Sequence, residues 1–318
     1  IDEIKRQARE RSFNSFHFSL SGGEPTFHPG YLDIMKHLAD DVDNTNYTSV
    51  HMTSNCSRKM DWFKTYVDHA SKFHRASITA SLHVEHVNTR DKMQDFADKL
   101  IFCQEHDVQV TINMVMVPDA FDMYYENALF FHNQGINVTL KPQSDPTASK
   151  IVDGYTDEMK QKLYNGMPQR AFTEVKNKYV TRPKAKFPIE SKQNISQNTE
   201  VPQHFQVEFQ DSKGKKWYMD QAERFNAFNF NKFEGWECSS GYRSIIIREP
   251  DGSVKRSYSC ADVPLGNIET GFKLFDAPMP CITKSCVSSA DSKIPKRKVG
   301  SGVSLYPLPQ STDHQQAQ

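Results

Sequence analysis

The chain has 318 residues, with 39 Lys and Arg against 39 Asp and Glu, so its formal net charge is zero. This balance gives no electrostatic reason to expect binding to nucleic acid or to a membrane surface. No apolar run approaches the length of a membrane span, and the chain opens without a signal-peptide pattern. Six cysteines are too few for a disulfide framework in a chain of this length, and four of them lie close together between residues 238 and 286. This usage indicates metal ligation in a reducing, cytoplasmic compartment.

The first half of the chain repeats a short strand pattern followed by an amphipathic helix pattern. The strand patterns begin roughly 30 residues apart, as expected of a βαβ repeat. The predicted strands are residues 16–20, 49–53, 76–82, 108–115 and 136–140. Apolar stripes around Leu38, Tyr66 and Leu100 predict the helices between them. Strands that alternate with helices predict an α/β fold with a parallel sheet, and so few strands predict a partial, crescent-shaped barrel with a further strand upstream of Ile1.

The periodicity fades after residue 143. Residues 144–200 are polar, and an amphipathic patch at 158–164 predicts a helix in a connecting region. Two hairpins are predicted after it, with strands at 204–209 and 216–219, and then at 244–248 and 254–258. They indicate a small hairpin-rich domain over residues 201–296. Residues 297–318 are polar and rich in Gly, Ser and Gln, which predicts a disordered tail.

The stretch Ser21-Gly22-Gly23-Glu24-Pro25 follows the first predicted strand. Glycine adopts positive φ without strain and lets the main chain approach a ligand closely. In parallel α/β barrels ligands bind at this carboxyl edge, although a tight strand-to-helix turn is an open alternative. Residues at the same edge could also face a ligand: Thr53, Ser54, Asn55, Ser81, His83, Asn113, Met116, Lys141 and Gln143.

A group of cysteines near the end of the chain has the spacing of metal ligands. The candidates are Cys238, Cys260, Cys281 and Cys286. The first two bracket the second predicted hairpin, and the last two are four residues apart, so the thiolates would come from separate loops. Four thiolates suit zinc or an iron–sulfur cluster, and the wide spacing favours the cluster. Unligated core cysteines are the alternative. Cys56 and Cys103 are predicted to be buried packing residues.

The glycine loop and the cysteine pattern together resemble radical S-adenosylmethionine enzymes that carry a SPASM or twitch auxiliary iron–sulfur domain. The resemblance covers residues 1–296. It implies a (βα)6-type partial barrel over residues 1–143 that lacks its first strand, and one auxiliary [4Fe-4S] cluster on the four cysteines. The amino group of the S-adenosylmethionine cofactor would be held by Gly22, Gly23 and Glu24, because an ammonium needs carbonyl and carboxylate oxygens. The cofactor-binding residues implied are Ser21, Gly22, Gly23, Glu24, Pro25, Asn55, Ser81, His83, Asn113 and Met116.

One departure from this family concerns its C-x₃-C-x₂-C loop, which holds the cluster that cleaves the cofactor and does not occur in this sequence. The loop would precede the helical pattern at residues 1–11, so we expect an N-terminally truncated chain that does not cleave the cofactor alone. The intact enzyme would form a 5′-deoxyadenosyl radical that abstracts hydrogen from a substrate, with a peptide or protein as the expected class. A flavodoxin- or ferredoxin-like reductase would supply electrons.

Two other functions stay open. One is a non-catalytic binding protein that retains the cofactor pocket or a zinc or iron–sulfur site. The other is an ordinary barrel enzyme, metal-free or stabilised by zinc, in which the glycine loop binds another amine or a phosphate.

Overall fold

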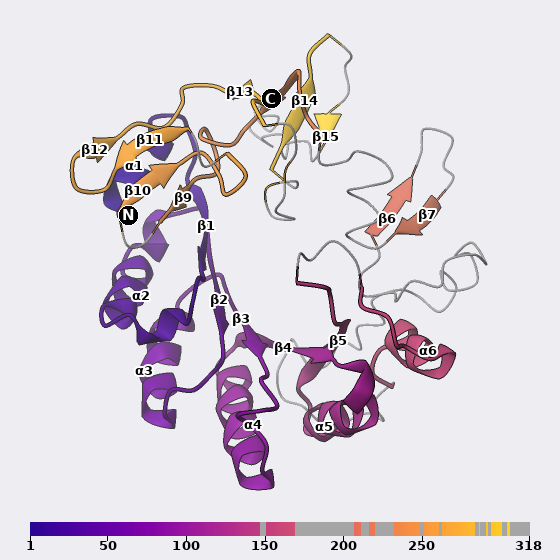
Figure 1. Ribbon diagram of the computed structural model, residues 1–318. Helices are drawn as coiled ribbons and strands as arrows, with labels where there is room; N and C mark the ends of the chain where they lie inside the picture. The colour runs from indigo at the N-terminus through magenta and orange to yellow at the C-terminus, as the bar shows by residue number, and fades with distance from the viewer. Residues whose placement is uncertain are drawn as a thin grey trace, which may run out of the picture. The chain divides into compact units, whose positions relative to one another are not determined.

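The structure is a computed structural model of the chain (Figure 1). It describes residues 1–146, 151–168, 207–210, 216–219, 232–248, 251–260, 263–283, 286, 291, 294–300 and 304–305. The chain divides into two compact units: one is Asn14–Ala222, and the other joins Ile1–Phe13 to Glu223–Gln318. The first unit contains a five-stranded parallel sheet, and the second contains two four-stranded antiparallel sheets.

The parallel sheet carries its strands in chain order from one edge to the other. They are β1 (Ser15–Leu20), β2 (Tyr47–Ser54), β3 (Arg75–Ser81), β4 (Val108–Met116) and β5 (Asn137–Pro142). Every neighbouring pair is parallel, so the five carboxyl ends share one edge of the sheet. The predicted α/β fold with a parallel sheet is confirmed, and the arrangement is compatible with a partial α/β barrel.

Helices connect the strands and cover one side of the sheet. They are α2 (Tyr31–Ala39), α3 (Met60–Ala70), α4 (Arg90–Glu105) and α5 (Phe121–Asn133), followed by α6 (Asp157–Asn165). In Figure 1, α2 to α5 run along the outer side of the row of strands. Thr89 and Thr156 directly precede α4 and α6 and cap their N-terminal ends. The side chain of each accepts a hydrogen bond from a backbone amide of the first turn, which is a favoured helix start. Helix α6 confirms the helix predicted from the patch at 158–164, while residues 169–200 lie outside the described part.

The core of this unit lies between the helices and the even-numbered residues of the strands. Val50, Ile78 and Ile112 are buried on that side of the sheet. The three predicted helical stripes supply the facing side chains, and Leu38 and Leu100 among them are fully buried. Tertiary burial of these stripes therefore fixes which face of each helix meets the sheet.

The second unit is built from short strands. They are β8 (Trp236–Cys238), β9 (Ile246–Ile247), β10 (Ser253–Lys255), β11 (Pro264–Asn267), β12 (Gly271–Phe272), β13 (Met279–Pro280), β14 (Lys296–Lys298) and β15 (Ser304–Leu305). One sheet has the order β12-β11-β10-β9 and the other β13-β8-β14-β15. The antiparallel pair β9–β10 confirms the second predicted hairpin. The first predicted hairpin is confirmed by the antiparallel pair of β6 (Val207–Gln210) and β7 (Lys216–Met219). Residues 204–206 of its first predicted strand lie outside the described part.

The N-terminal helix α1 (Asp2–Arg9) belongs to this second unit. The Gln7 side chain donates to the Phe272 carbonyl at 2.8 Å and accepts from the Leu274 amide at 2.7 Å. Arg11 donates to the carbonyl oxygens of Leu274 and Phe275, both at 2.9 Å. Residues 1–13, predicted to belong with the parallel sheet, fall instead in this second unit. Gln7 of α1 and Arg11 after it satisfy backbone groups at the end of β12 and just beyond it.

The predicted disordered tail also differs from the structure over its first residues. Arg297 lies in β14, which pairs with β8, and its guanidinium contacts the Glu237 carboxylate at 3.0 Å. Ser304–Leu305 form β15 against β14. Residues 306–318 lie outside the described part. Among the helices that the structure describes, none combines the length and apolarity that crossing a membrane requires.

Candidate cofactor and metal sites

The carboxylate of Glu24 ties the loop after β1 to the end of β2. One of its oxygens accepts from the Thr26 hydroxyl at 2.6 Å, the Thr26 amide at 3.2 Å and the Ser54 hydroxyl at 2.8 Å. The other accepts from the Asn55 amide at 2.6 Å. Arg58 adds a further link by donating to the Thr26 carbonyl at 2.9 Å. The carboxylate predicted to bind a ligand ammonium is thus occupied by protein donors, and it fixes two strand-end loops together.

The exposed part of this edge is the pair Gly22 and Gly23. Their φ angles are +111° and +53°, a region that favours glycine. A Cβ added at either position would meet no atom within 4 Å, so the space beside the loop is open. Within the described part of the chain, no backbone amide of a turn or loop donates to the carbonyl oxygen of Gly22 or Gly23. These two carbonyl groups are the acceptors that the loop can offer to a small ligand.

The side of the sheet opposite the helices is polar. Its rows include Ser19–His51–Ser77–Gln109 and Thr53–Thr79–Thr111–Asn137. His17 Nδ1 lies 2.8 Å from Ser49 Oγ and His51 Nδ1 lies 2.9 Å from Ser77 Oγ, so side chains bond across neighbouring strands. Parallel sheets usually bury apolar residues on both faces. This face instead offers hydroxyl, amide and imidazole groups, which suits contact with a polar ligand.

The other predicted cofactor residues divide between the two faces of the sheet. Ser81 and Asn113 are paired in register at the carboxyl end of the polar face. Asn55 lies in the loop held by Glu24, and His83 follows β3 with half of its side chain exposed. The Met116 side chain differs, because it is fully buried on the side of β4 that faces the helices. The strand ends therefore bring polar groups together at the carboxyl edge of the sheet, and the Met116 side chain is not among them.

Lys141 adds a positive charge to the polar side of this edge. It pairs in register with Val115, and its neighbour two positions earlier, Thr139, pairs with Asn113. Burial lowers the pKa of the Lys141 ammonium. A half-buried ammonium at a ligand edge suits a carboxylate or phosphate oxygen.

The four cysteines predicted as metal ligands are all buried, and all are free thiols. Cys238 ends β8, the strand between β13 and β14. Cys281 directly follows β13, and its amide donates to the Trp236 carbonyl at 2.7 Å. The sheet pairing therefore sets Cys238 and Cys281 on adjacent segments. Cys260 lies after β10, where its amide donates to the Ser257 hydroxyl at 3.2 Å.

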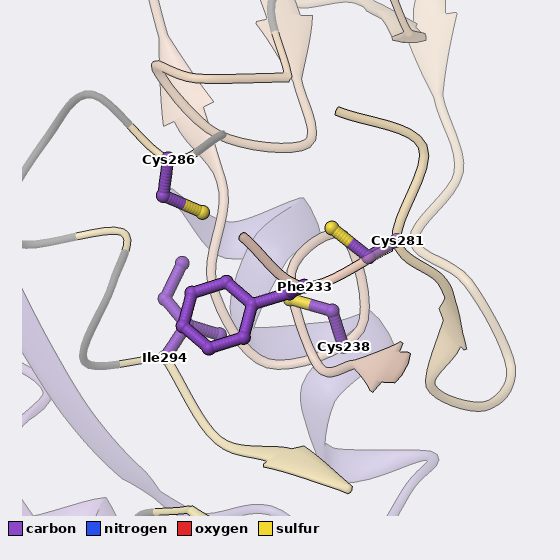
Figure 2. Packing of buried hydrophobic residues seen from close by; sticks show 5 residues of the cluster. All are labelled: Phe233, Cys238, Cys281, Cys286 and Ile294. Carbon is purple, nitrogen blue, oxygen red and sulfur yellow. The ribbon is translucent and has the colours of Figure 1, made fainter. Parts of the chain in front are cut away.

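Three of these thiols belong to one buried cluster. Cys238, Cys281 and Cys286 pack with Phe233 and Ile294, and Figure 2 shows their sulfur atoms turned toward the same space beside the Phe233 ring. Burial raises the pKa of the Cys260 thiol, and Cys281 and Cys238 add smaller contributions in the same direction, so the fourth cysteine lies near these two. The structure thus gathers residues that lie far apart in the sequence.

Two buried cations act on these thiols. Burial raises the pKa of Cys286 to about 12, and the Lys296 ammonium opposes that rise. Burial likewise raises the pKa of Cys260, against which the Ser257 hydroxyl and the Arg256 guanidinium act. Metal ligands are thiolates, so nearby positive charge favours the ionised form that a metal needs.

The spacing of the thiols bears on the kind of metal group. In the described part of the chain, no three His, Cys, Asp or Glu side chains are arranged to hold one metal ion. A single zinc would require four sulfur atoms at about 2.3 Å from one centre. A four-iron cluster binds each thiolate at a different iron and so separates the ligands more widely. The described part of the chain thus shows four buried free thiols and no preformed site for a single metal ion.

Neither comparison with known proteins finds a match: no protein-family model matches the chain, and no curated protein matches it. The class of this protein is therefore described by its fold and by its two candidate sites. It is an α/β protein with an open glycine loop at the carboxyl edge of a parallel sheet and a second unit that carries four buried cysteines, three of them in one cluster.

Sequence reasoning assigned no role to several residues that build these sites. Thr26 and Arg58 hold the loop of Glu24, and only the three-dimensional proximity of two loops reveals this. Arg256 and Lys296 are buried beside the cysteines, although Lys and Arg in a polar segment usually read as solvated surface. The polar face, in contrast, had a signal: the period-two alternation of Ser, Thr and His along the predicted strands.

Proposed function

We propose that this chain binds S-adenosylmethionine at the carboxyl edge of its parallel sheet and holds an iron–sulfur cluster on four cysteines. The proposal makes it part of a radical S-adenosylmethionine enzyme with an auxiliary cluster. The cluster ligands would be Cys238, Cys260, Cys281 and Cys286.

The observation that carries the proposal is the strand-end loop of Gly22 and Gly23. Its positive φ angles and open surroundings leave two carbonyl oxygens beside the carboxyl edge of a parallel sheet. Glu24, the next residue, links this loop to the end of β2 because its carboxylate accepts hydrogen bonds from Ser54 and Asn55. Carbonyl oxygens at fixed positions suit the ammonium of an amino acid such as the methionine half of the cofactor.

The other residues of the edge would orient the rest of the cofactor. Ser81 and Asn113 offer hydroxyl and amide groups for its ribose, and Lys141 offers a cation for a carboxylate of cofactor or substrate. When bound and reduced by the family's three-cysteine cluster, which this sequence lacks, S-adenosylmethionine supplies a radical that abstracts hydrogen from a substrate. The polar face would hold that substrate beside the cofactor and exclude competing groups, with a peptide or protein as the proposed class.

Binding of S-adenosylmethionine to the purified chain tests the first half of the proposal. Gly22→Ala is expected to weaken binding about fivefold or more, because alanine is strained by about 1–3 kcal/mol at that φ, which corresponds to roughly 5- to 150-fold in affinity. Gly30→Ala is the matched control, since Gly30 lies in the same connection with ordinary φ. Calorimetric titration gives both affinities. No binding by the unsubstituted chain, or equal affinities for both variants, would refute the cofactor site.

Anaerobic reconstitution with iron and sulfide tests the second half. We expect about four irons per chain and broad visible absorbance from thiolate-bound iron. Ser substitution of all four cysteines should abolish both signals, whereas Cys103→Ser, at a buried thiol of helix α4, should keep the iron. A colourless protein that carries one zinc would contradict the cluster. We also expect no 5′-deoxyadenosine from this chain with dithionite, since it lacks the three-cysteine loop.

A further inference from the structure

Arg256 is a buried guanidinium in the middle of the cysteine unit. Only 2% of the residue is exposed. Its Nε donates to the Ser240 carbonyl at 3.0 Å and to the Ser240 hydroxyl at 2.7 Å. Its Nη1 donates to the Pro280 carbonyl at 2.9 Å, and Nη2 donates to the carbonyl oxygens of Met279 at 2.9 Å and Cys238 at 3.5 Å.

These bonds connect the two segments that carry Cys238 and Cys281. The Cys238 carbonyl belongs to β8, while Met279 and Pro280 form β13 directly before Cys281. The Ser240 hydroxyl that accepts from Arg256 also accepts from the Cys238 thiol at 3.4 Å. A planar guanidinium with several fixed donors can hold two chain segments at a set separation, which a flexible ammonium does less well.

The charge of Arg256 is not compensated by these contacts. Every hydrogen-bond acceptor of its guanidinium in the described part of the chain is a neutral carbonyl or hydroxyl oxygen. Burying a cation without an anion costs free energy that neutral dipoles offset only in part. The thiols of Cys238, Cys260 and Cys281 are the groups nearby that become anionic when they bind a metal.

We propose that Arg256 is the positioning residue of the four-cysteine site, holding the segments of Cys238 and Cys281 and compensating the negative charge of the thiolate-bound metal group. This inference rests on the proposed function, because it takes the four cysteines to be ligands. It assigns a role in ligand geometry and charge to a residue that touches no metal itself. Outer-shell residues of this kind commonly change metal affinity by 10–100-fold.

The test compares Arg256→Gln and Arg256→Lys with the unsubstituted chain after anaerobic reconstitution with iron and sulfide. For Arg256→Gln we expect iron release to a chelator at least about tenfold faster, and a more negative reduction potential, because reduction adds charge that loses its compensating cation. Arg256→Lys keeps the positive charge but loses the planar arrangement of hydrogen-bond donors. It should therefore release iron faster, while its reduction potential stays close to that of the unsubstituted chain.

Arg297→Gln is the matched control. Arg297 lies in β14, and its largely exposed guanidinium pairs with Glu237, the residue before Cys238. Its iron release and reduction potential should equal those of the unsubstituted chain. Thermal unfolding of the metal-free proteins checks that each variant folds.

Iron release and potential in Arg256→Gln equal to those of the unsubstituted chain would overturn the role of Arg256 and leave the cluster in place. If Arg256→Gln does not fold, Arg256→Lys decides: faster iron release supports the role, and unchanged release overturns it. If the unsubstituted chain takes up zinc in place of iron, the proposed cluster fails, and zinc release from the same variants decides the role of Arg256. If it takes up neither metal, both proposals fail together.

Discussion

At the scale of single residues, Glu24 shows how one charged side chain can hold two strand-end loops together. Its carboxylate accepts hydrogen bonds from Thr26, Ser54 and Asn55 and so joins the loops after β1 and β2. Hydrogen bonds to a charged group contribute about 1.5–3 kcal/mol each, more than neutral ones. The loop that carries Gly22 and Gly23 is therefore linked to the end of β2 through the residue that follows it.

Glu24→Gln should destabilise this unit by about 1–3 kcal/mol, because the amide removes the charge and turns donor hydrogens toward donors. Denaturant unfolding gives the free energy of unfolding. Glu126→Gln, at an exposed position of helix α5, is the control and should change stability by less than about 0.5 kcal/mol. Equal stability of the two variants would mean that the Glu24 bonds contribute nothing to the fold.

At the scale of elements, the parallel strands separate an apolar side from a polar side. Ile78 is buried toward the helices, while its neighbour Ser77 faces the other way and bonds to His51 on β2. The period of two along a strand makes this separation possible, since successive side chains point to opposite faces. The polar side of the sheet therefore presents hydroxyl and imidazole groups in place of an apolar surface.

The histidines of the polar face predict how stability depends on pH. Burial lowers the pKa of His17 and His51, and Arg75 lowers both further. The folded state then binds fewer protons than the unfolded state, in which the pKa of a histidine is about 6.5. Stability is therefore present in full above about pH 6.5 and is lost as the pH falls through the lowered pKa values of the folded state.

His51→Gln should reduce this loss, because one of the two titrating groups is removed. Unfolding free energies at pH 7 and at pH 5 measure the difference. His106→Gln, at the exposed end of helix α4, is the control and should keep the pH dependence of the unsubstituted chain. The same slope for His51→Gln as for the control would show that the polar face does not titrate on unfolding.

At the scale of the whole molecule, the N-terminal helix shares a unit with the cysteines near the other end of the chain. The amide of Gln7 bonds to Phe272 and Leu274 in the way that a neighbouring strand would. Arg11 completes the contact through Leu274 and Phe275. The cysteine unit is thus closed by chain segments from both ends of the sequence.

Gln7→Ala should open this contact, because the Leu274 amide loses its acceptor. We expect hydrogen exchange of that amide to become about tenfold faster or more, as the loss of one buried hydrogen bond costs about 1–3 kcal/mol. Glu10→Ala is the control, since the exposed ion pair of Glu10 with Arg6 contributes little to stability. Unchanged protection of Leu274 in Gln7→Ala would contradict the contact.

The sequence alone predicted the sheet, because its signals are local. Alternating strands, apolar helical stripes and turn residues located all five parallel strands and the first three helices between them, α2, α3 and α4. The same kind of local signal also located both hairpins in the later part of the chain. It also marked Gly22 and Gly23, since a Gly-Gly pair at a strand end indicates positive φ, which both residues adopt.

Only the tertiary structure decided which distant residues support these sites. The bonds of Glu24 to β2, the docking of Gln7 onto Leu274 and the burial of Arg256 among the cysteine segments each join residues that are not neighbours in the chain. A sequence pattern reports the preference of a residue for a local conformation and for burial. The partner of a buried polar group depends instead on how the elements pack. For this reason the candidate ligand residues could be named from the sequence, while the residues that position them could not.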